Sequence, residues 1–395
     1  KANAGAAGVD KQSIEDFERN LQDNLYKLWN RMSSGSYFPP PVKAVPIPKK
    51  SGGERILGVP TVADRVAQMV VKQVFEPKVE SHFRPDSYGY RPGRSALDAV
   101  GVTRKRCWRY DWVLEFDIKG LFDNIEHELL VKAVRKHAQS SWEVLYIERW
   151  LKAPMSMGDG SLVQRTRGTP QGGVISPVLA NLFLHYAFDL WMERTHPGVP
   201  WCRYADDGLV HCRTEQEAQT IHAALVERLR QCKLELHPTK TRIVYCKDSN
   251  RRRVRPVTKF DFLGFCFRPR STRNKRTGCM FVCFMPGVSP SAQKAMRQSI
   301  RKSNLRNRTD LGLQDIARFY NPVLRGWLNY YGKINLSAMK PVLRHFNLTL
   351  IAWAKHKFRK LKGHKTRAWR FVEKIAKARP ELFVHWQRGM PGGFA

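Results

Sequence analysis

Two adjacent carboxylates, Asp206 and Asp207, offer the clearest chemistry in this chain, between the apolar runs 202–205 and 208–211. Asp-Asp-Gly between two such runs is typical of the tip of a β-hairpin. A hairpin tip would put both carboxylates in solvent, where their oxygens can bind hard divalent cations. Taken alone, the same residues could also form a turn without any chemical role.

A third carboxylate, Asp117, ends the apolar run from Trp112 to Phe116. A strand that ends in Asp and a hairpin that carries Asp-Asp are what two-metal phosphoryl transfer needs. In such a reaction one ion activates a primer 3′-hydroxyl, and the other holds the triphosphate and the leaving pyrophosphate. We therefore expect Asp117 and Asp206 to bridge two Mg²⁺ ions, for which Mn²⁺ can substitute, with Asp207 as third ligand or support.

Cationic and glycine-rich stretches could hold the triphosphate. Lys49 and Arg55 lie on the two arms of a predicted hairpin, and Lys43 lies further back on the first arm. Solvated surface charge is the alternative interpretation of these three. The stretch Gly168–Gly173 precedes a predicted helix, and its Gln171 could hydrogen-bond a nucleotide, although most glycine-rich turns are ordinary loops.

The rest of the sequence predicts an α+β fold with interleaved strands and helices. The expected helices cover residues 13–32, 61–79, 128–137, 177–193 and 215–232. The expected strands cover residues 42–48, 54–59 and 111–118, with further strands that end near 267. Beyond residue 289 the pattern is helical, and Trp353 and Phe358 are the aromatic residues most expected in that helical core.

The charge of the chain points to a polyanionic partner. The 395 residues contain 69 Lys and Arg against 34 Asp and Glu, a formal net charge of +35. Such an excess indicates nucleic acid or an anionic membrane as partner. No apolar run reaches membrane-spanning length, so nucleic acid is the better interpretation. Basic residues interleaved with aromatic ones after residue 289 suit a surface that grips phosphates and packs on sugars or bases.

The eight cysteines show no paired framework, which is typical of a reducing compartment. Cys279 and Cys283 have no second Cys or His pair nearby, so two cysteines on one face of a strand are more plausible than a zinc site. No secretory segment is visible. The chain begins with Lys1, within what looks like a motif, and we expect that further residues precede it.

Several stretches resemble reverse transcriptases in order and spacing: Phe116–Asp123, Gly168–Gly173, Tyr204–Asp207, Leu234–Lys240 and Phe262–Phe265. The finer resemblance is to reverse transcriptases encoded by bacterial group II introns, through residues 5–10, 56–61, 87–94 and 326–331. It implies a right-hand polymerase with an α-helical thumb. Residues 1–110 would form the fingers with a truncated N-terminal extension, 111–285 the palm with remaining fingers elements, and 286–395 the thumb or maturase domain with a basic tail.

The resemblance also implies roles for individual residues. The metal ligands would be Asp117, Ile118, Asp206 and Asp207. The incoming dNTP would contact Lys43, Lys49, Arg55, Gln171 and Phe122, the last as the ring that excludes a ribose 2′-hydroxyl unless it is an ordinary core residue. Lys240 resembles a lysine that protonates pyrophosphate, with a simple surface lysine as the alternative. The primer grip would be Phe262, Leu263, Gly264 and Phe265, and further nucleic-acid contacts would be Arg91, Arg94, Arg325, Trp327, Tyr330 and Tyr331.

The function implied by the resemblance is RNA-directed DNA synthesis together with splicing assistance. The partners would be the group II intron RNA, bound as a ribonucleoprotein, a DNA target and primer, and dNTPs, with no membrane, in the bacterial cytoplasm at the nucleoid. No Cys/His-rich endonuclease module precedes Ala395, so second-strand cleavage is not expected. The alternatives are a domesticated or other bacterial reverse transcriptase without an intron partner, and a maturase that only binds RNA and assists splicing.

Overall fold

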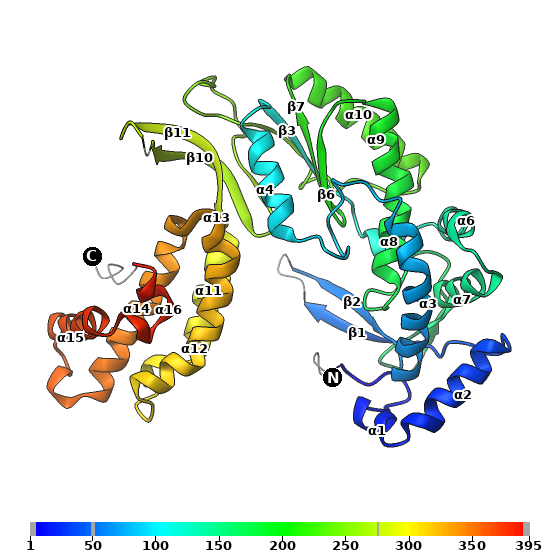
Figure 1. Ribbon diagram of the computed structural model, residues 1–395, viewed down its shortest axis with the longest axis horizontal. Coiled ribbons are helices and arrows are strands. Elements are labelled where there is room, and N and C mark those ends of the chain that lie inside the picture. The colour runs from blue at the N-terminus through cyan, green and yellow to red at the C-terminus, as the bar shows by residue number, and fades with distance from the viewer. Residues whose placement is uncertain (1–4, 49–51, 275, 390–395) are drawn as a thin grey trace. The chain divides into compact units, whose positions relative to one another are not determined.

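The computed structural model describes residues 5–48, 52–274 and 276–389 (Figure 1). The chain forms two compact units. The first unit contains residues 1–99 and 112–243, and the second unit contains residues 100–111 and 244–395. The prediction of an α+β fold followed by a helical region is confirmed, whereas the finer boundaries of fingers, palm and thumb remain a prediction.

A four-stranded sheet has the order β6-β7-β3-β8, and its first three strands lie in the first unit. Its strands are β6 (Trp201–Tyr204), β7 (Asp207–Cys212), β3 (Trp112–Asp117) and β8 (Arg242–Tyr245). Strand β7 runs antiparallel to both β6 and β3. Helix α10 (Glu215–Gln231) packs against β3 and β7, and buries Ile221, Leu225 and Leu229 (Figure 1). The apolar side of α10 therefore covers one face of β3 and β7, the strands that carry Asp117 and Asp207.

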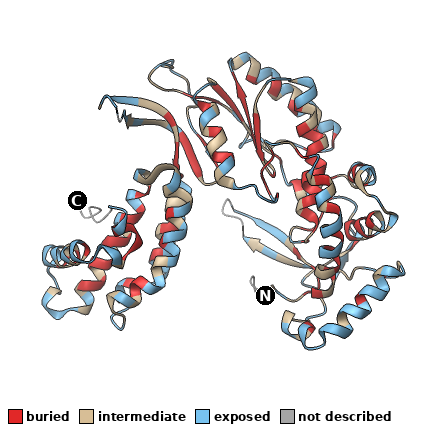
Figure 2. Ribbon diagram, viewed as in Figure 1, coloured by how far each residue is buried: buried red, intermediate tan, exposed pale blue. Residues whose placement is uncertain are grey.

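The helices of the chain up to residue 243 differ from the predictions in several places. Helices α3 (Val62–Glu80), α6 (His127–His137) and α10 were expected; α4 (Ala96–Cys107) and α7 (Ser141–Lys152) were not. The expected helix 13–32 is two helices, α1 (Ile14–Arg19) and α2 (Leu21–Ser33), because Asn20 leaves the helical conformation. The expected helix 177–193 consists of α8 (Ser176–Leu184), the π-helical turn η1 (His185–Asp189) and α9 (Leu190–Thr195). Helix α8 is buried along almost its whole length, as Figure 2 shows.

A second sheet of the first unit has the order β2-β1-β4-β5. Its strands are β1 (Val42–Pro48), β2 (Glu54–Val59), β4 (Met155–Ser156) and β5 (Leu162–Val163). The predicted hairpin of β1 and β2 is present, with Ile47 opposite Arg55 in the register. Its turn includes residues 49–51, which lie outside the described residues.

The second unit combines a three-stranded ribbon with a helical bundle. The ribbon has the order β11-β10-β9 and contains β9 (Phe260–Phe262), β10 (Phe265–Arg273) and β11 (Met280–Val288), so it extends beyond the strands predicted to end near 267. The main helices are α11 (Pro290–Lys302), α12 (Leu313–Trp327), α14 (Lys340–Lys357), α15 (Lys365–Ala378) and α16 (Val384–Gln387). Short turns join them: η2 (Leu305–Asn307), η3 (Leu328–Gly332), α13 (Lys333–Asn335), η4 (Leu336–Met339), η5 (Arg359–Leu361) and η6 (Pro380–Leu382).

The helical core confirms one of the two aromatic predictions. Trp353 is 1% exposed, together with Phe346 and Trp386 in the same cluster. Phe358 is 36% exposed, so its assignment to the core was wrong. It lies just after the last residue of α14, where its ring meets the edges of Trp353 and Phe371 at the surface.

All eight cysteines are free thiols. Cys283 lies in β11, whereas Cys279 lies one residue before that strand, so the two cysteines predicted to share one face of a strand are not both within it. Among the described residues, no group of three or more His, Cys, Asp or Glu is placed to hold a metal ion, and this includes these cysteines. Over the same residues, no helix combines the length and the apolar character needed to cross a membrane.

Candidate active site

The turn that joins β6 to β7 carries the adjacent carboxylates. Tyr204 is paired with Asp207, which leaves Ala205 and Asp206 as the two turn residues. The hairpin was predicted, but its tip lies one residue earlier than expected, and Asp207 is already the first residue of β7. Ala205 has φ of 56°, a left-handed conformation that costs free energy in a residue with a Cβ. The turn therefore needs surrounding contacts to hold it.

The strand register brings Asp117 to the same place. Asp117 lies directly opposite Asp207 in the β3–β7 pair. Residues directly opposite in an antiparallel pair point to the same face of the sheet, with Cβ atoms about 5 Å apart. Asp206 follows at the turn, where its carbonyl oxygen accepts a hydrogen bond from the Ile118 N–H at 3.4 Å. Asp117, which is distant in the sequence, thus lies beside the adjacent residues Asp206 and Asp207.

The carboxylates of the turn are less solvated than a hairpin tip suggests. Burial raises the pKa of Asp207 to about 7, and the charges of Asp206 and Asp117 add to the rise. Burial also raises the pKa of Asp206, again with a contribution from Asp117. Both residues are half-buried, so the prediction that their carboxylates lie in solvent is met only in part. Half-buried carboxylates that repel one another are an unfavourable arrangement unless a cation joins them.

Lys240 supplies one such cation. Its Nζ donates to Asp117 Oδ2 at 2.7 Å. Burial opposes the charge, yet the hydrogen bond to Asp117 and the charges of Asp207 and Asp206 leave the pKa of Lys240 above its usual value. Main-chain hydrogen bonds hold the segment before β8 against the end of β3. The Lys119 N–H donates to Glu235 O at 2.9 Å, and the His237 N–H donates to Asp117 O at 2.7 Å, which brings Lys240 close to Asp117.

The donor set suits Mg²⁺ or Mn²⁺ in its chemistry. Carboxylate oxygens are the ligands that hard divalent cations prefer, and the mutual repulsion of Asp117, Asp206 and Asp207 would be relieved by one. Among the described residues, however, no three of these carboxylates are already placed as a complete metal-binding group. With the Lys240 ammonium on Asp117 Oδ2, a bound ion would have to share or displace that contact.

Phe122 lies close to these carboxylates in the short helix α5 (Leu121–Asn124), which begins after Gly120 in a left-handed conformation. Its half-buried ring meets the Tyr90 ring edge-on, with centroids 6.3 Å apart. Burial, followed by the charge of Asp206, raises the pKa of Tyr90, so this second ring also lies near the turn. Two aromatic rings therefore border the carboxylates, and the sequence had indicated only one.

The glycine-rich stretch packs directly on α5. The Gly168 and Thr169 N–H groups donate to Ile125 O and Phe122 O at 2.7 and 2.6 Å. A Cβ at Gly168 would lie 2.7 Å from the carbonyl oxygens of Phe122 and Asp123, and its φ is +78°, so glycine is required there. Gln171 Nε2 donates to both Asp123 oxygens, at 3.1 and 3.2 Å. Asp123 thus already engages the amide predicted to bind a nucleotide.

An open cleft of about 440 Å³ joins several of these groups, among them Arg55, Phe122, Gln171 and Arg165. The cleft unites three of the residues predicted to contact a dNTP. Lys43 shares a face of the hairpin with Arg55 but lies four residues along β1 from Ile47, the partner of Arg55, a distance of about 13 Å. Lys49 lies outside the described residues.

A buried polar group that the sequence analysis missed holds the glycine-rich stretch. Gln68 in α3 accepts the Val174 N–H at 2.7 Å, and its Nε2 donates to Asp64 Oδ2 at 3.0 Å. The other oxygen of Asp64 accepts from Tyr37 and Trp150. A Ser/Thr/Asp pattern at a helix start predicts a cap at most, so the sequence holds no signal for these long-range bonds.

In the second unit, Phe262–Phe265 forms the turn between β9 and β10, with φ of 52° at Leu263 and 80° at Gly264. Tyr330 donates to Leu263 O at 2.9 Å, and the ring of Tyr331 lies 5.1 Å from that of Phe265. Both tyrosines were predicted to bind nucleic acid. Their half-buried side chains pack on this turn and support it, and their contact with nucleic acid stays a prediction.

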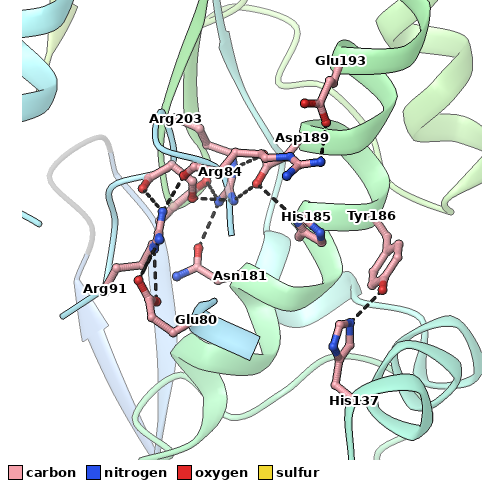
Figure 3. Close-up of polar contacts among 12 residues, drawn as sticks. Glu80, Arg84, Arg91, His137, Asn181, His185, Tyr186, Asp189, Glu193 and Arg203 are labelled. Carbon is pink, nitrogen blue, oxygen red and sulfur yellow. Dashed lines mark hydrogen bonds and ion pairs between the residues drawn. The ribbon is translucent and has the colours of Figure 1, made fainter. Parts of the chain in front are cut away.

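The remaining predicted nucleic-acid contacts differ in exposure. Arg91 is 8% exposed and donates to both Glu80 oxygens and to the carbonyls of Arg84 and Ser87, so its prediction as a contact was wrong (Figure 3). Arg94 is exposed, with its guanidinium 5.9 Å from the Tyr88 ring centroid. Arg325 is exposed on α12, and Trp327 is half-buried against the helical core. Arg94 and Arg325 thus remain available for phosphates.

Comparison with known proteins agrees with this geometry. A reverse transcriptase (RNA-dependent DNA polymerase) family profile matches residues 47–267, and a group II intron maturase-specific domain matches residues 293–371. Protein YkfC of Escherichia coli is 31% identical over 288 residues, which cover 62% of this chain and 74% of that protein. Group II intron-encoded protein LtrA of Lactococcus lactis is 33% identical over 187 residues, 47% of this chain and 31% of LtrA.

The alignment with LtrA spans about a third of that relative, whereas that with YkfC spans about three quarters. The matched reverse-transcriptase region contains Asp117, Asp206, Asp207 and the cleft, and the maturase match covers most of the helical bundle. Because the first match covers more than half of the chain and the second follows it, the protein belongs to the reverse transcriptases, among those that carry a group II intron maturase domain.

Proposed function

We propose that this reverse transcriptase copies RNA into DNA by two-metal nucleotidyl transfer at Asp117, Asp206 and Asp207, and that it binds a group II intron RNA. The observation that carries the polymerase part is the register of Asp117 opposite Asp207, with Asp206 beside them and the cleft of Arg55, Phe122 and Gln171 in the same unit. When bound, the two Mg²⁺ ions would lower the pKa of the primer hydroxyl and neutralise the triphosphate.

The protein residues would then position and balance charge. The carboxylates of Asp117, Asp206 and Asp207 and the main-chain carbonyl of Ile118 would hold the ions, with Asp207 as support. Arg55 offsets charge on the triphosphate, while Gln171 exchanges its bond to Asp123 for one to the nucleotide. Lys240, hydrogen-bonded to Asp117, is near enough to the ion site to deliver a proton to the leaving pyrophosphate.

Splicing assistance is the second part of the proposal. The maturase-domain match and the positive charge of the chain support binding to intron RNA. Copying that RNA at a DNA target, primed by the DNA, would give intron mobility. The place of action would be the bacterial cytoplasm, at the nucleoid.

Sequencing the RNA that copurifies with the protein, together with primer extension on the same preparation, tests both parts. We expect one intron RNA to dominate and a primed RNA template to be copied. Extension without enrichment of any intron would favour a reverse transcriptase without an intron partner. Intron enrichment without extension would favour a maturase that only binds RNA.

The raised pKa of Asp207 predicts pH-dependent metal binding. A carboxyl must lose its proton to bind the ion, and with a pKa of about 7 its ionised fraction rises about tenfold between pH 6 and pH 8. We therefore expect Mn²⁺ affinity, measured by calorimetry, to rise by about the same factor. In the metal-free protein, the folded state holds the Asp207 proton more tightly than the unfolded state does, because the pKa is raised from 3.8 to about 7. This contribution to the free energy of unfolding is complete below about pH 4 and is lost as the pH rises through about 7.

Asp207→Asn provides the control for this prediction. The variant should bind Mn²⁺ more weakly, with a flatter pH dependence. Equal Mn²⁺ affinities of the wild-type protein at pH 6 and pH 8 would contradict the assignment of Asp207 to the metal.

Phe122→Ala is expected to relax sugar selection. The Phe122 ring borders the cleft that contains Gln171, and removing it opens space for a 2′-hydroxyl. The ratio of dNTP to rNTP incorporation, measured as kcat/KM for each, should fall by about 10- to 100-fold, or 1–3 kcal/mol. Phe122→Tyr keeps the ring and should keep the selection. An unchanged ratio in Phe122→Ala would remove Phe122 from this role.

A further inference from the structure

A buried guanidinium lies directly beneath the turn that carries Asp206 and Asp207. Arg203 in β6 is 0% exposed, although arginine is almost never fully buried unless it is paired. Its partner Asp189 is also 0% exposed and lies in the π-helical turn η1 (Figure 3). Arg203 Nε and Nη2 donate to Oδ1 and Oδ2 of Asp189, both at 2.8 Å, a bidentate pair.

The other N–H groups of Arg203 connect three further segments. Nη1 donates to Asn181 Oδ1 at 3.0 Å and to the carbonyl of Ala205 at 3.1 Å, and Nη2 donates to Ser87 Oγ at 2.8 Å. A guanidinium has five N–H donors, so each has a partner. The Arg203 guanidinium therefore links α8, η1 and the loop at residues 86–90 to the turn that carries Ala205 and Asp206.

The loop at residues 86–90 is locked to the same turn. The Arg203 N–H donates to Asp86 O, and Arg203 O accepts from the Tyr88 N–H at 2.8 Å. Asn181 Nδ2 donates to Gly89 O at 2.6 Å. A Cβ at Gly89 would overlap the backbone nitrogen of Ala205, so the loop lies in direct contact with the turn.

The π-helical turn directs Asp189 toward Arg203. A π turn frees main-chain carbonyls from the regular helix pattern, and Arg228 donates to two of them, Tyr186 O at 2.9 Å and Ala187 O at 3.0 Å. His185, one helical turn before Asp189, has its pKa lowered to about 3 by burial and is therefore uncharged. Burial raises the pKa of Asp189, and Arg203, which donates to both of its oxygens, opposes that rise.

We propose that Arg203 is a positioning residue that fixes the left-handed conformation of Ala205 and thereby the direction of the Asp206 and Asp207 carboxylates. The hydrogen bond to Ala205 O is its direct link to the turn, and Asp189, Asn181 and Ser87 fix the guanidinium that makes it. This inference rests on the proposed function, since it concerns the metal ligands of that site. A strained turn at the metal ligands persists only where its surroundings determine it, and these bonds provide that restraint.

A buried ion pair could also serve stability alone, so the test separates the two roles. Arg203→Met/Asp189→Leu replaces both charges with apolar side chains, which often preserves stability. Arg203→Lys keeps the charge but cannot make five bonds in a fixed plane. Lys78→Met is the matched control, because Lys78 forms a pair at 2.7 Å with Glu143, which is 0% exposed, elsewhere in the first unit.

The readouts are melting temperature, Mn²⁺ affinity by calorimetry, and kcat and KM for dNTP. We expect the double variant and Arg203→Lys to bind Mn²⁺ about tenfold more weakly and to lose about 10- to 100-fold in kcat, with KM for dNTP nearly unchanged. Lys78→Met should melt earlier but keep both wild-type values.

Wild-type Mn²⁺ affinity and kcat in a folded double variant would overturn the positioning role. Should that variant fail to fold, the same result in Arg203→Lys would overturn it. A wild-type protein that binds Mn²⁺ but extends no primer would refute the proposed function, whereas the comparison of Mn²⁺ affinities would still decide the role of Arg203.

Discussion

Asp206→Asn is expected to reduce primer extension by at least about 10³-fold while leaving the affinity for RNA within about twofold. Loss of one anionic ligand weakens the bound ions, and positioning by those ions accounts for most of the rate of phosphoryl transfer. The charge of Asp117 raises the pKa of Asp206, and the charges of Asp206 and Asp117 raise the pKa of Asp207, so the three carboxylates lie close enough to interact. Single-turnover extension on a saturating RNA–DNA primer-template measures the loss in the chemical step.

The control is Glu115→Gln, on the same strand as Asp117. Glu115 pairs with Arg242 at 2.8 Å, and its removal should change the extension rate by less than about tenfold. RNA binding and splicing stimulation should survive in Asp206→Asn. Equal loss of splicing stimulation and extension would show that the two activities do not separate, and retained extension would remove Asp206 from the metal site.

The sequence predicted the parts of the site that depend on local pattern. Apolar runs predicted β3 and the two arms β6 and β7, and the turn signal between β6 and β7 predicted the hairpin. Asp117 ends its strand, and strand pairing alone is enough to bring it opposite a carboxylate of the hairpin. The predicted strands 42–48 and 54–59 also agree with β1 and β2, because glycine and proline limit them sharply.

The sequence could not show which polar side chains form hydrogen bonds within the protein and are therefore not available to a ligand. Arg91 and Arg94 stand in one Arg-Pro-Gly-Arg stretch, yet Arg91 is buried on Glu80 and Arg94 is exposed. Tyr330 and Tyr331, predicted as nucleic-acid contacts, also pack on the turn at Leu263 and Gly264, a role that the sequence did not indicate. Long-range packing decides each case, and a local pattern contains no information about it.

The sequence around Arg203 contains one indication of a buried ion pair, because a charged residue stands within a largely apolar stretch. Arg203 stands within the buried run 201–203, where a charge is expensive unless it is paired. Its partner Asp189 lies in a helix that departs from α geometry, so neither spacing nor periodicity identifies the pair. A charged residue inside an apolar strand next to a catalytic turn is thus a reason to expect a buried ion pair, but not to name its members.

Affinity for intron RNA is expected to fall by at least about 10³-fold between 50 and 200 mM salt. A protein that contacts six to ten phosphates releases a corresponding number of counterions, which sets the slope of log K against log salt. The second unit exposes many basic side chains, among them Arg325 on α12 and, around the end of α14 and the start of α15, Lys360, Lys362 and Lys365. Filter binding or fluorescence anisotropy over a salt series measures the slope.

Lys360→Gln/Lys362→Gln/Lys365→Gln tests whether this part of the second unit is the binding surface. If all three contact phosphates, the slope should become shallower by about 2, since each contact in RNA contributes about 0.7 to 0.9. The control, Lys27→Gln/Arg135→Gln/Arg230→Gln, removes the same charge from α2, α6 and α10 of the first unit. An equal change in both triple variants would mean that net charge, rather than a defined surface, attracts the RNA, and a flat salt response of the wild-type protein would exclude a phosphate-binding surface altogether.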